Sequence, residues 1–472
     1  MSGPNAGDAV TPVASELDLR SFLEQVRKAR PSDVLDVGRE VDPNHETAAI
    51  LTKLEAKQRS PILLFSQVRG CEWPLATNVC GSMGRLALAL GCGIKDVASR
   101  YAMAATSTIA PVVVENALVQ RVVHRGADVD LGRFPALRYH TDDAPHPYLT
   151  AAVVVARDPD DGITNLSFHR LMIASRNTAG IFIEPGRHLD GIVRKCAARG
   201  QDVPVAVFLG AHPAWSLGAL YAGRADVDEF DVIGGLLGAP LAVTRCLLDP
   251  QLRVPARAEF VLEGVISTTE RMVEGPFGEF TGYGTGQTES PVLRIDAVSH
   301  REDPIVQDIV SGHLEHLVLS MPALEHRALR DARAAVAGVT RVALVAPLTA
   351  VVALQKQHDE EPARIIEAML DDVYAKQVIV VDDDVDPSDL AKVLTAMALQ
   401  CQPATAVRVF HGMRGTPLDP SCDHPEGLGS KLGIDATRPL APKREVTRNR
   451  IPQEVLDRVD LAELLAKPGR SV

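Results

Sequence analysis

The chain has 472 residues, which is too long for one hydrophobic core, so its length predicts two or three domains. Apolar residues make up 46% and charged residues 23% of the sequence, which is typical of a soluble globular protein. The formal net charge of −12, from 61 acidic and 49 basic side chains, argues against nucleic acid and against an anionic membrane as the main partner.

No segment of the sequence predicts a membrane span or a secretory signal. The longest apolar run, residues 342–354, is interrupted by Pro347 and is shorter than the roughly 20 residues that a spanning helix needs, so we predict a buried strand there. The N-terminus has neither a basic start nor an apolar stretch. Seven scattered cysteines without a CxxC pair predict reduced thiols in the cytoplasm, with no zinc site and no disulfide.

The N-terminal part, after a start at residues 1–15 that we predict to be disordered, alternates between helical and strand patterns. Asp42-Pro43-Asn44 offers a cap residue and an early proline, so a helix is predicted to begin there. The alternation predicts a small α/β domain over residues 1–110. The predicted helices cover residues 17–30, 42–54 and 81–90, and the predicted strands cover residues 34–41 and 61–68.

The central part, residues 111–318, consists of short apolar segments rich in β-branched residues and separated by Gly, Pro and Asp. Only one helix is predicted in it, at residues 190–199. Many short strands with few long helices are typical of a β-barrel or a sandwich. The predicted strands cover residues 112–114, 119–123, 149–155, 163–166, 180–183, 203–209, 241–247, 261–267, 292–299 and 304–310.

Helix and strand patterns alternate again in the C-terminal part, which predicts an α/β domain over residues 319–445. The final segment, residues 446–472, contains an amphipathic helix at 453–466 whose apolar side could pack on its own chain or on a second subunit. The whole chain is therefore predicted to have a multidomain α+β and α/β fold. The predicted helices of the C-terminal domain cover residues 319–336, 362–374 and 389–399, and its strands cover residues 339–345, 378–381 and 406–410.

Two carboxylates stand five residues apart in Glu274-Gly-Pro-Phe-Gly-Glu279. The Gly-Pro pair excludes a helix interior, so both acids are predicted to lie on a tight loop. A pair of carboxylates in a confined site can have its pKa values pushed apart, which leaves one group as a proton carrier. From the spacing alone, a surface turn with solvated acids is the commoner outcome.

Three further segments carry polar residues of the types that hold phosphates and metal ions. Arg170 ends the segment Asn165-Leu-Ser-Phe-His-Arg, and a guanidinium can hold a phosphate or a carboxylate with two parallel hydrogen bonds. His188 precedes a predicted helix, and Glu229 lies in an acidic segment. An amide oxygen, an imidazole and a carboxylate suit Mg²⁺ or Mn²⁺ better than zinc or copper. The spacing does not link these three segments, and a lone histidine near a helix start is more often a cap or a packed residue.

These segments, in this order, resemble the UbiD family of decarboxylases over nearly the whole chain. The turn around Glu274 and Glu279 is the most specific of them, and Asp382-Asp383-Asp384 and the Gly-Ser-Lys sequence at 429–431 support it. Two residues depart from common members of the family, namely His169 and Arg187. The segments that carry the resemblance are residues 19–23, 40–43, 165–170, 187–188, 229–235, 274–283, 381–384 and 429–436.

The resemblance implies a flavin-reductase-like split β-barrel in the middle of the chain. It also implies prenylated FMN as the cofactor, with its phosphate bound through Mn²⁺ (or Mg²⁺) and with K⁺ nearby. By position, Asn165, His188 and Glu229 match the family's metal ligands, and Arg170, Glu274 and Glu279 match its catalytic set. The residues that the resemblance places against the cofactor and its phosphate are Asn165, Leu166, Ser167, Phe168, His169, Arg170, Arg187, His188, Glu229 and Lys376, with Lys431 as the second candidate lysine.

The resemblance further implies reversible, non-oxidative decarboxylation of an aromatic, heteroaromatic or α,β-unsaturated carboxylic acid, with Glu279 as the proton donor. The alternatives are an FMN-dependent oxidoreductase and a non-catalytic flavin-binding protein on the same scaffold. The expected partners are a small carboxylic acid, further copies of the chain in a homodimer or larger assembly, and a separate flavin prenyltransferase that supplies the cofactor.

His313 and His316 fit pocket lining and ordinary packing equally well, and the Asp382–384 triplet is expected to be a solvated turn before a helix capped by Asp386 or Ser388.

Overall fold

The first helix shows how local sequence sets local structure in this chain. In the computed structural model, which describes residues 16–104, 106–221, 223, 226–422, 427–441, 449 and 451–461, helix α1 spans Leu19–Ala29. The Asp18 carboxylate accepts a hydrogen bond from the Ser21 N–H at 2.8 Å, and the Ser21 hydroxyl accepts one from the Asp18 N–H at 2.9 Å. This capping box fixes the start of the helix, whose apolar side is buried. The predicted disorder of residues 1–15 lies outside the described residues.

The N-terminal sheet combines strands from two distant parts of the sequence. Its order is β1-β2-β3-β18, and β18 comes from more than 200 residues after β3 and pairs with it in parallel. The predicted helix start at Asp42-Pro43-Asn44 is wrong, because the Asp42 carboxylate accepts a hydrogen bond from the Asn44 N–H at 2.8 Å and holds a local turn. The elements are β1 (Val34–Val37), β2 (Ile62–Phe65), β3 (Leu75–Thr77), β18 (Val306–Asp308), α2 (Glu46–Glu55), α3 (Met83–Ala89) and α4 (Val97–Ala104).

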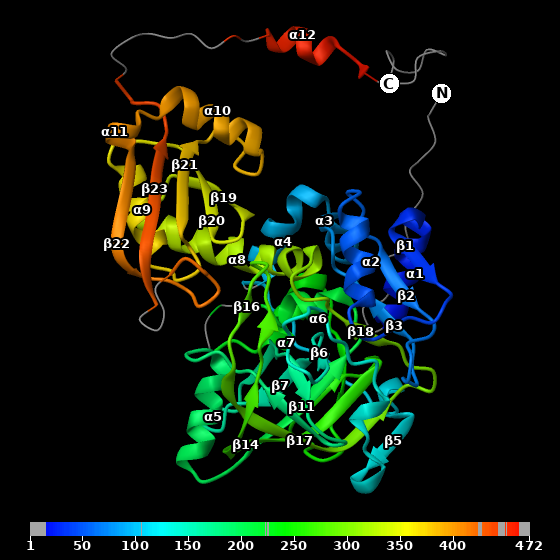
Figure 1. Cartoon of the computed structure of the whole chain (residues 1–472). Coiled ribbons are helices and arrows are strands. Elements are labelled where there is room, and N and C mark those ends of the chain that lie inside the picture. Colours follow the sequence, from blue (N-terminus) through cyan, green and yellow to red (C-terminus); the bar gives the residue numbers. More distant parts are fainter. Residues whose placement is uncertain are drawn as a thin grey trace.

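A nine-stranded sheet forms the centre of the molecule and curls into a half-barrel (Figure 1). Its order is β6-β9-β10-β17-β14-β11-β7-β8, and β5 pairs with β17 off this path. The two longest strands, β14 and β17, pair with register shifts near Gly264 and after Ile266, and such shifts bend and twist a sheet. The strands are β5 (Val122–Arg125), β6 (Tyr148–Leu149), β7 (Val153–Arg157), β8 (Thr164–Phe168), β9 (Leu171–Ile173), β10 (Thr178–Ile181), β11 (Val203–Leu209), β14 (Phe260–Glu274) and β17 (Thr288–His300).

The prediction of one helix in this central part is wrong, because the described residues contain three: α5 (His188–Ala198), α6 (Pro213–Gly218) and α7 (Glu229–Leu237). All six residues of α6 are buried, so it has no polar side and no helical periodicity in its sequence. Helix α7 is capped by Asp228, whose carboxylate accepts a hydrogen bond from the Phe230 N–H at 3.0 Å. Two small sheets accompany these helices, formed by β4 (Val112–Val113), β12 (Ala242–Arg245) and β13 (Arg253–Pro255), and by β15 (Phe277–Gly278) and β16 (Gly284–Thr285).

The C-terminal part is a five-stranded sheet of order β19-β20-β21-β23-β22 with its own helices. The predicted single strand at residues 342–354 is wrong, because the run folds into the β19–β20 hairpin around Leu348, which has a φ of 58°. The expected cap by Asp386 or Ser388 is also wrong, since the Asp389 carboxylate accepts the hydrogen bond from the Lys392 N–H. The elements are α8 (Leu314–Ala335), β19 (Val339–Ala346), β20 (Thr349–Leu354), α9 (Glu361–Leu370), β21 (Gln377–Asp382), α10 (Leu390–Gln400), α11 (Pro403–Ala406), β22 (Val407–Arg414), β23 (Leu428–Ala436) and α12 (Gln453–Arg458).

Helix α12 covers the first part of the amphipathic helix predicted at 453–466, and the part beyond Leu461 lies outside the described residues. Leu456 and Val459 are 51% and 49% exposed, and Leu461 is also exposed. These three leucine and valine side chains therefore remain largely exposed on their own chain, whereas Val455 is half-buried.

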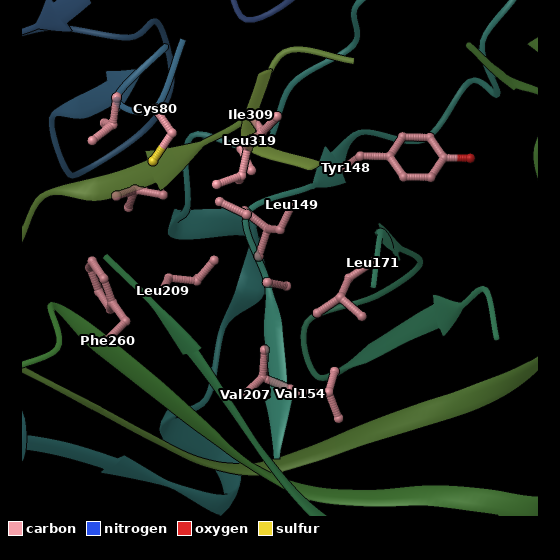
Figure 2. Close-up of a cluster of buried hydrophobic side chains, with 14 of the residues drawn as sticks. Cys80, Tyr148, Leu149, Val154, Leu171, Val207, Leu209, Phe260, Ile309 and Leu319 are labelled. Atoms are coloured by element: carbon pink, nitrogen blue, oxygen red, sulfur yellow. The ribbon is translucent and has the colours of Figure 1, made fainter. Parts of the chain in front are cut away.

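One hydrophobic core joins the N-terminal sheet to the concave side of the curled sheet. Figure 2 shows Cys80, which follows β3, in the same cluster as Leu149, Val207 and Phe260 of the central sheet. The C-terminal sheet has separate clusters on its two faces. The chain therefore has the mixed α+β, multidomain architecture that the sequence predicts. None of the described helices combines the length and the apolar character needed to cross a membrane.

Candidate active site

Glu274 and Glu279 lie on a β-hairpin and not on a solvated surface turn. Strand β14 ends at Glu274, and β15 and β16 pair across the turn that follows, in which the Glu279 N–H donates to the Tyr283 carbonyl at 2.9 Å. Gly275 has a φ of 84°, and a Cβ there would lie 2.8 Å from the Gly286 carbonyl oxygen, so the hairpin requires glycine at this position. The Glu274 side chain is fully buried and that of Glu279 is 14% exposed.

Arg170, which follows β8, lies between these two acids. Its Nε and Nη2 donate to the two oxygens of Glu274 at 2.8 and 2.9 Å, and its Nη1 donates to Glu279 Oε1 at 2.6 Å. The guanidinium also lies over two aromatic rings, 4.3 Å from the centroid of Phe182 and 4.7 Å from that of Phe277. Charge-assisted hydrogen bonds and ring stacking together fix the orientation of this buried cation.

The two acids have different surroundings. Burial raises the pKa of Glu279, the nearby Arg170 guanidinium opposes this shift, and the charge of Glu274 adds to it. Glu274 accepts a third hydrogen bond, from the Tyr148 hydroxyl at 3.1 Å, so both of its oxygens are engaged. Burial raises the pKa of Tyr148, which keeps its hydroxyl as a donor. Glu274 can therefore hold Arg170, while the raised pKa makes Glu279 the more easily protonated carboxylate to exchange a proton.

Two residues that the sequence did not assign belong to this site. Tyr148 had no signal, because its partner Glu274 is 126 residues away. His316 is the second, since burial lowers its pKa to about 4, the charge of Arg170 acts in the same direction, and its ring packs edge-on against Phe280 at 5.7 Å. His313 instead pairs with Glu55 at 3.0 Å. Of the two histidines that the sequence left open, only His316 is near the acid pair.

A second cluster brings together Asn165 of β8, His188 at the start of α5 and Glu229 at the start of α7. The Asn165 Nδ2 donates to Glu229 Oε1 at 3.1 Å, and the His188 Nδ1 lies 3.8 Å from the same oxygen. Burial raises the pKa of Glu229, and hydrogen bonds from His188 and Asn165 oppose this. The three predicted metal ligands thus converge from three separate elements.

The donors in this cluster fit a hard divalent cation. The Glu229 Oε2 is buried and has no hydrogen-bond partner, which is costly for a carboxylate unless a cation supplies the missing interaction. In the described part of the chain, no three His, Cys, Asp or Glu side chains form a group that could hold a metal. The third ligand of this cluster would therefore be the amide of Asn165, and an amide oxygen is a donor suited to Mn²⁺ or Mg²⁺.

Hydrogen bonds link Asn165 through the Ser167 hydroxyl to the His169 ring. The His169 Nδ1 lies 2.8 Å from the Phe182 carbonyl, which can only accept, so Nδ1 must carry the proton. The His169 Nε2, 2.9 Å from the Ser167 hydroxyl, must then accept the single proton of that hydroxyl. The Asn165 Oδ1 lies 3.2 Å from the same hydroxyl and competes for its proton. The His169 ring is therefore buried, is turned to the Phe182 carbonyl and reaches Asn165 through Ser167.

Leu166, Phe168 and Arg187 are the other residues of the central part that are predicted to lie against the cofactor. The Leu166 side chain is buried in a hydrophobic core, so only its backbone can face a ligand, and Phe168 packs partly against the same core. Arg187 precedes α5 and donates to Glu184 at 2.9 Å. The Tyr374 hydroxyl of the C-terminal part donates to the same Glu184, so the C-terminal part touches the loop that leads to His188.

The two candidate lysines are engaged within the C-terminal part. The Lys376 Nζ pairs with the Asp419 carboxylate at 2.7 Å, and the Lys376 side chain is 29% exposed. The Lys431 Nζ is buried and donates to the backbone carbonyls of Leu370 and Asp372 at 2.6 and 2.7 Å. Lys431 is therefore held by structure, and Lys376 is the more accessible of the two.

Comparisons with known proteins agree with this geometry. Three domains described for 3-octaprenyl-4-hydroxybenzoate carboxy-lyase match the chain, the N-terminal domain over residues 27–104, the Rift-related domain over residues 112–314 and the C-terminal domain over residues 319–436. The fold and the site thus define a carboxy-lyase, an enzyme that removes CO₂ from its substrate. The chain belongs to the UbiD family of decarboxylases.

Relatives of known activity cover nearly the whole chain. The phenolic acid decarboxylase of Streptomyces sp. (strain D7) is 32% identical over 448 residues, which cover 90% of this chain and 93% of that protein. The anhydromevalonate phosphate decarboxylase of Methanothermobacter thermautotrophicus is 30% identical over 435 residues, covering 91% and 99%.

A solved structure shows the same fold. The UbiD-class enzyme HmfF from Pelotomaculum thermopropionicum, in complex with FMN, has a TM-score of 0.86 at 34% identity and covers 94% of this chain and 99% of its own. An evolved dimeric form of HmfF, in complex with prenylated FMN (prFMN), has a TM-score of 0.81 at 33% identity with the same coverage. The two decarboxylases named above act on chemically different acids, so they do not identify the substrate of this chain. The two HmfF structures hold the flavin in two forms, FMN and prenylated FMN.

Proposed function

We propose that the protein catalyses the reversible, non-oxidative decarboxylation of an aromatic, heteroaromatic or α,β-unsaturated carboxylic acid with prenylated FMN. The observation that carries the proposal is the position of Arg170 between a fully paired Glu274 and a Glu279 whose pKa is raised. A protein that only bound flavin would not need a buried acid able to give up a proton beside a fixed cation. The rings of Phe182, Phe277 and Phe280 around this pair suit a flat, conjugated substrate.

The reaction replaces a carboxylate by a hydrogen atom, so each turnover releases one CO₂ and consumes one proton. The guanidinium of Arg170 attracts and orients the substrate carboxylate, and Glu274 keeps the guanidinium in place. Glu279 then gives its proton to the carbon that has lost CO₂. In the carboxylation direction, Glu279 removes that proton again.

Asn165, His188 and Glu229 would hold Mn²⁺ (or Mg²⁺), and K⁺ would lie nearby. Prenylated FMN, when bound, would supply an electron-accepting ring for the electron pair that remains on the substrate when CO₂ leaves. The N-terminus of α5 begins at His188, and a helix N-terminus favours a phosphate. Arg187 and Lys376 are the cations that we propose for the same phosphate, with Ser167, Phe168, His169 and the backbone of Leu166 along the flavin.

The same proposal covers the architecture and the assembly. We propose that the chain has domains at residues 1–110, 111–318 and 319–445. The curled sheet of the middle domain would be a split barrel of the flavin-reductase type. We also propose that the chain forms a homodimer or a larger homo-oligomer through residues 446–472, because Leu456 of α12 and the following Val459 and Leu461 are exposed on their own chain. The prenylated flavin would come from a separate flavin prenyltransferase.

The test replaces Glu279 by glutamine in protein shown by intact mass to carry prenylated FMN. Glu279→Gln keeps the size and a hydrogen bond to Arg170 but cannot give a proton, so turnover should fall by roughly 10²-fold or more. Glu289→Gln, an exposed residue of the neighbouring strand β17, is the matched control and should behave as the wild type. Normal turnover of Glu279→Gln with normal uptake of solvent deuterium into the product would refute the role of Glu279, and plain FMN in the active enzyme would refute the cofactor.

A further inference from the structure

Residues 139–148 run along the hairpin that carries the acid pair. The Tyr148 hydroxyl donates to Glu274 Oε1 at 3.1 Å, the Ala144 N–H donates to the Pro276 carbonyl at 2.7 Å, and the Gly278 N–H donates to Asp143 Oδ1 at 2.8 Å. These contacts fall on every second residue of the hairpin, and the last one immediately precedes Glu279. This segment therefore braces the hairpin from one side up to its catalytic residue.

Asp143 is the most completely bonded residue of this segment. Its second oxygen, Oδ2, accepts hydrogen bonds from the backbone N–H groups of Tyr139 at 3.2 Å and His140 at 2.8 Å, and it lies 3.2 Å from the His140 Nδ1. Burial alone would raise the pKa of Asp143, but the hydrogen bonds from the side chain and backbone of His140 and from the Gly278 N–H lower it. The carboxylate is therefore ionised at neutral pH and can accept all of these bonds at once.

The opposite side of Gly278 is held as tightly. The Ser311 hydroxyl donates to the Gly278 carbonyl, so both backbone polar groups of Gly278 are anchored by side chains. The His140 ring lies against the Gly278 Cα, since a Cβ at this position would be 2.4 Å from the His140 Nδ1. Glu279 is the next residue, and its carboxylate contacts Arg170 at 2.6 Å. A shift of Gly278 must therefore move the Glu279 carboxylate relative to Arg170.

We propose that Asp143 is a positioning residue for the reaction, which sets the place of Glu279 through the backbone of Gly278. The proposal rests on the role of Glu279 as proton donor. The charged groups that face Glu279 are Arg170 and Glu274, and the neutral His316 packs on the adjacent Phe280. Asp143 does not touch the reacting atoms, so its effect reaches the reaction only through the geometry of the hairpin.

Asp143→Asn is the variant that separates this role from simple filling of space. An asparagine keeps the volume, but it has only one oxygen that can accept hydrogen bonds. Its NH₂ group must therefore face either the Gly278 N–H or the N–H groups of Tyr139 and His140, and the hydrogen bonds on that side are lost. Loss of the Gly278 anchor frees Glu279 to leave Arg170. We expect kcat to fall by about 10- to 100-fold, because a misplacement of about 1 Å has effects of this size, while KM changes little because Arg170 and Glu274 are still paired.

The pH profile provides a readout that a purely structural role would not move. Turnover requires protonated Glu279, so kcat falls as the pH rises through the pKa of this residue. Arg170 lowers that pKa, and partial loss of its contact should move the alkaline limb of the kcat profile of Asp143→Asn to higher pH. Ser311→Ala removes the other anchor of Gly278 and should change kcat and the limb in the same directions by a smaller amount.

The experiment compares these variants as holoenzymes with equal content of prenylated FMN, confirmed by intact mass. Asp142→Asn, a change of the exposed neighbour, is the matched control and should retain the wild-type kcat and profile. Wild-type kcat and an unshifted limb in Asp143→Asn would overturn the proposal, and if that variant does not fold, the same result in Ser311→Ala overturns it. A fully active Glu279→Gln enzyme would remove the proposed function together with this inference, whereas an inactive Glu279→Gln with a normal Asp143→Asn would refute the inference alone.

Discussion

The unpartnered oxygen of Glu229 gives a prediction about stability that does not depend on catalysis. Glu229 is 1% exposed, and its Oε2 has no hydrogen-bond partner. In flavin-free, metal-free protein this carboxylate should destabilise the fold, because a buried, unsatisfied charged group costs about 1–3 kcal/mol or more. Glu229→Gln removes the charge, so the free energy of unfolding of the metal-free variant should equal that of the wild type or exceed it by about 1–3 kcal/mol.

Added Mn²⁺ should shift this stability difference toward the wild type. A ligand at a concentration of 100 times its Kd stabilises a protein by about 2.7 kcal/mol, which is the gain expected for the wild type. The glutamine variant lacks the anionic ligand, and if its Kd is 100-fold higher, the same Mn²⁺ concentration stabilises it by only about 0.4 kcal/mol. The stability difference then shifts by about 2.3 kcal/mol toward the wild type, which makes the wild type the more stable protein in Mn²⁺ wherever its metal-free deficit is smaller than this shift.

Glu263 supplies a matched control. It is also a buried glutamate whose pKa is raised by burial, but its two oxygens accept hydrogen bonds from the Leu247 and Leu248 N–H groups at 2.9 and 2.7 Å. Glu263→Gln should therefore lose about 1.5–3 kcal/mol, since hydrogen bonds to a charged group are weakened, and should keep the full response to Mn²⁺.

The assay is urea unfolding of the three flavin-free proteins, with a chelator and with excess Mn²⁺. A metal-free Glu229→Gln protein destabilised as strongly as Glu263→Gln would show that the Glu229 charge is compensated within the protein. An undiminished response of Glu229→Gln to Mn²⁺ would show that the metal, if it binds, does so elsewhere. Either result would refute the argument from the unpartnered oxygen.

Three further predictions follow from other parts of the structure. Arg170→Lys cannot hold both oxygens of Glu274 and also reach Glu279, so kcat/KM in initial-rate assays should fall by roughly 10²-fold, and a change below tenfold would contradict the role of the guanidinium. Burial raises the pKa of Glu315 from 4.5 to about 8, so the stability that its protonated form contributes is lost as the pH rises over this interval. Urea unfolding at several pH values should show this fall in the free energy of unfolding, and Glu315→Gln should make the fall shallower. An equally steep fall in the variant and the wild type would contradict the prediction. Light scattering should find a dimer or larger assembly that Leu456→Asp weakens, and a wild-type monomer at micromolar concentration would end that proposal.

The sequence predicts elements well where local chemistry decides them. The run at 203–209 is apolar and β-branched, and β11 covers the same residues, Val203–Leu209. Helix α6 escaped because it is short and buried on all sides, so no periodicity marks it. The β19–β20 hairpin escaped because Leu348 takes the positive φ of its turn, where glycine or asparagine would have been the usual signal.

The site shows the same limit over longer distances. Spacing alone favoured a solvated turn for Glu274 and Glu279, and burial reverses that outcome because Arg170, 104 residues before Glu274, lies against both. Asn165 and Glu229 are 64 residues apart, and nothing local in either segment indicates the other. The resemblance to a family linked these segments, while Tyr148 and Asp143 carry no local signal and required the fold.

The hydrogen bonding of three buried glutamates distinguishes the roles that we propose for them. Both oxygens of Glu274 accept strong hydrogen bonds, so a change in its protonation would break contacts to Arg170 and Tyr148, and it suits a fixed anchor. Glu279 has one cationic partner, and burial raises its pKa, so its two protonation states are closer in energy and it suits proton transfer. Glu229 has one oxygen without any protein partner in a cluster with an imidazole and an amide, and an added cation would complete this cluster. Chemically identical side chains would thus serve as an anchor, a proton carrier and a metal ligand according to how many of their lone pairs the surrounding protein satisfies.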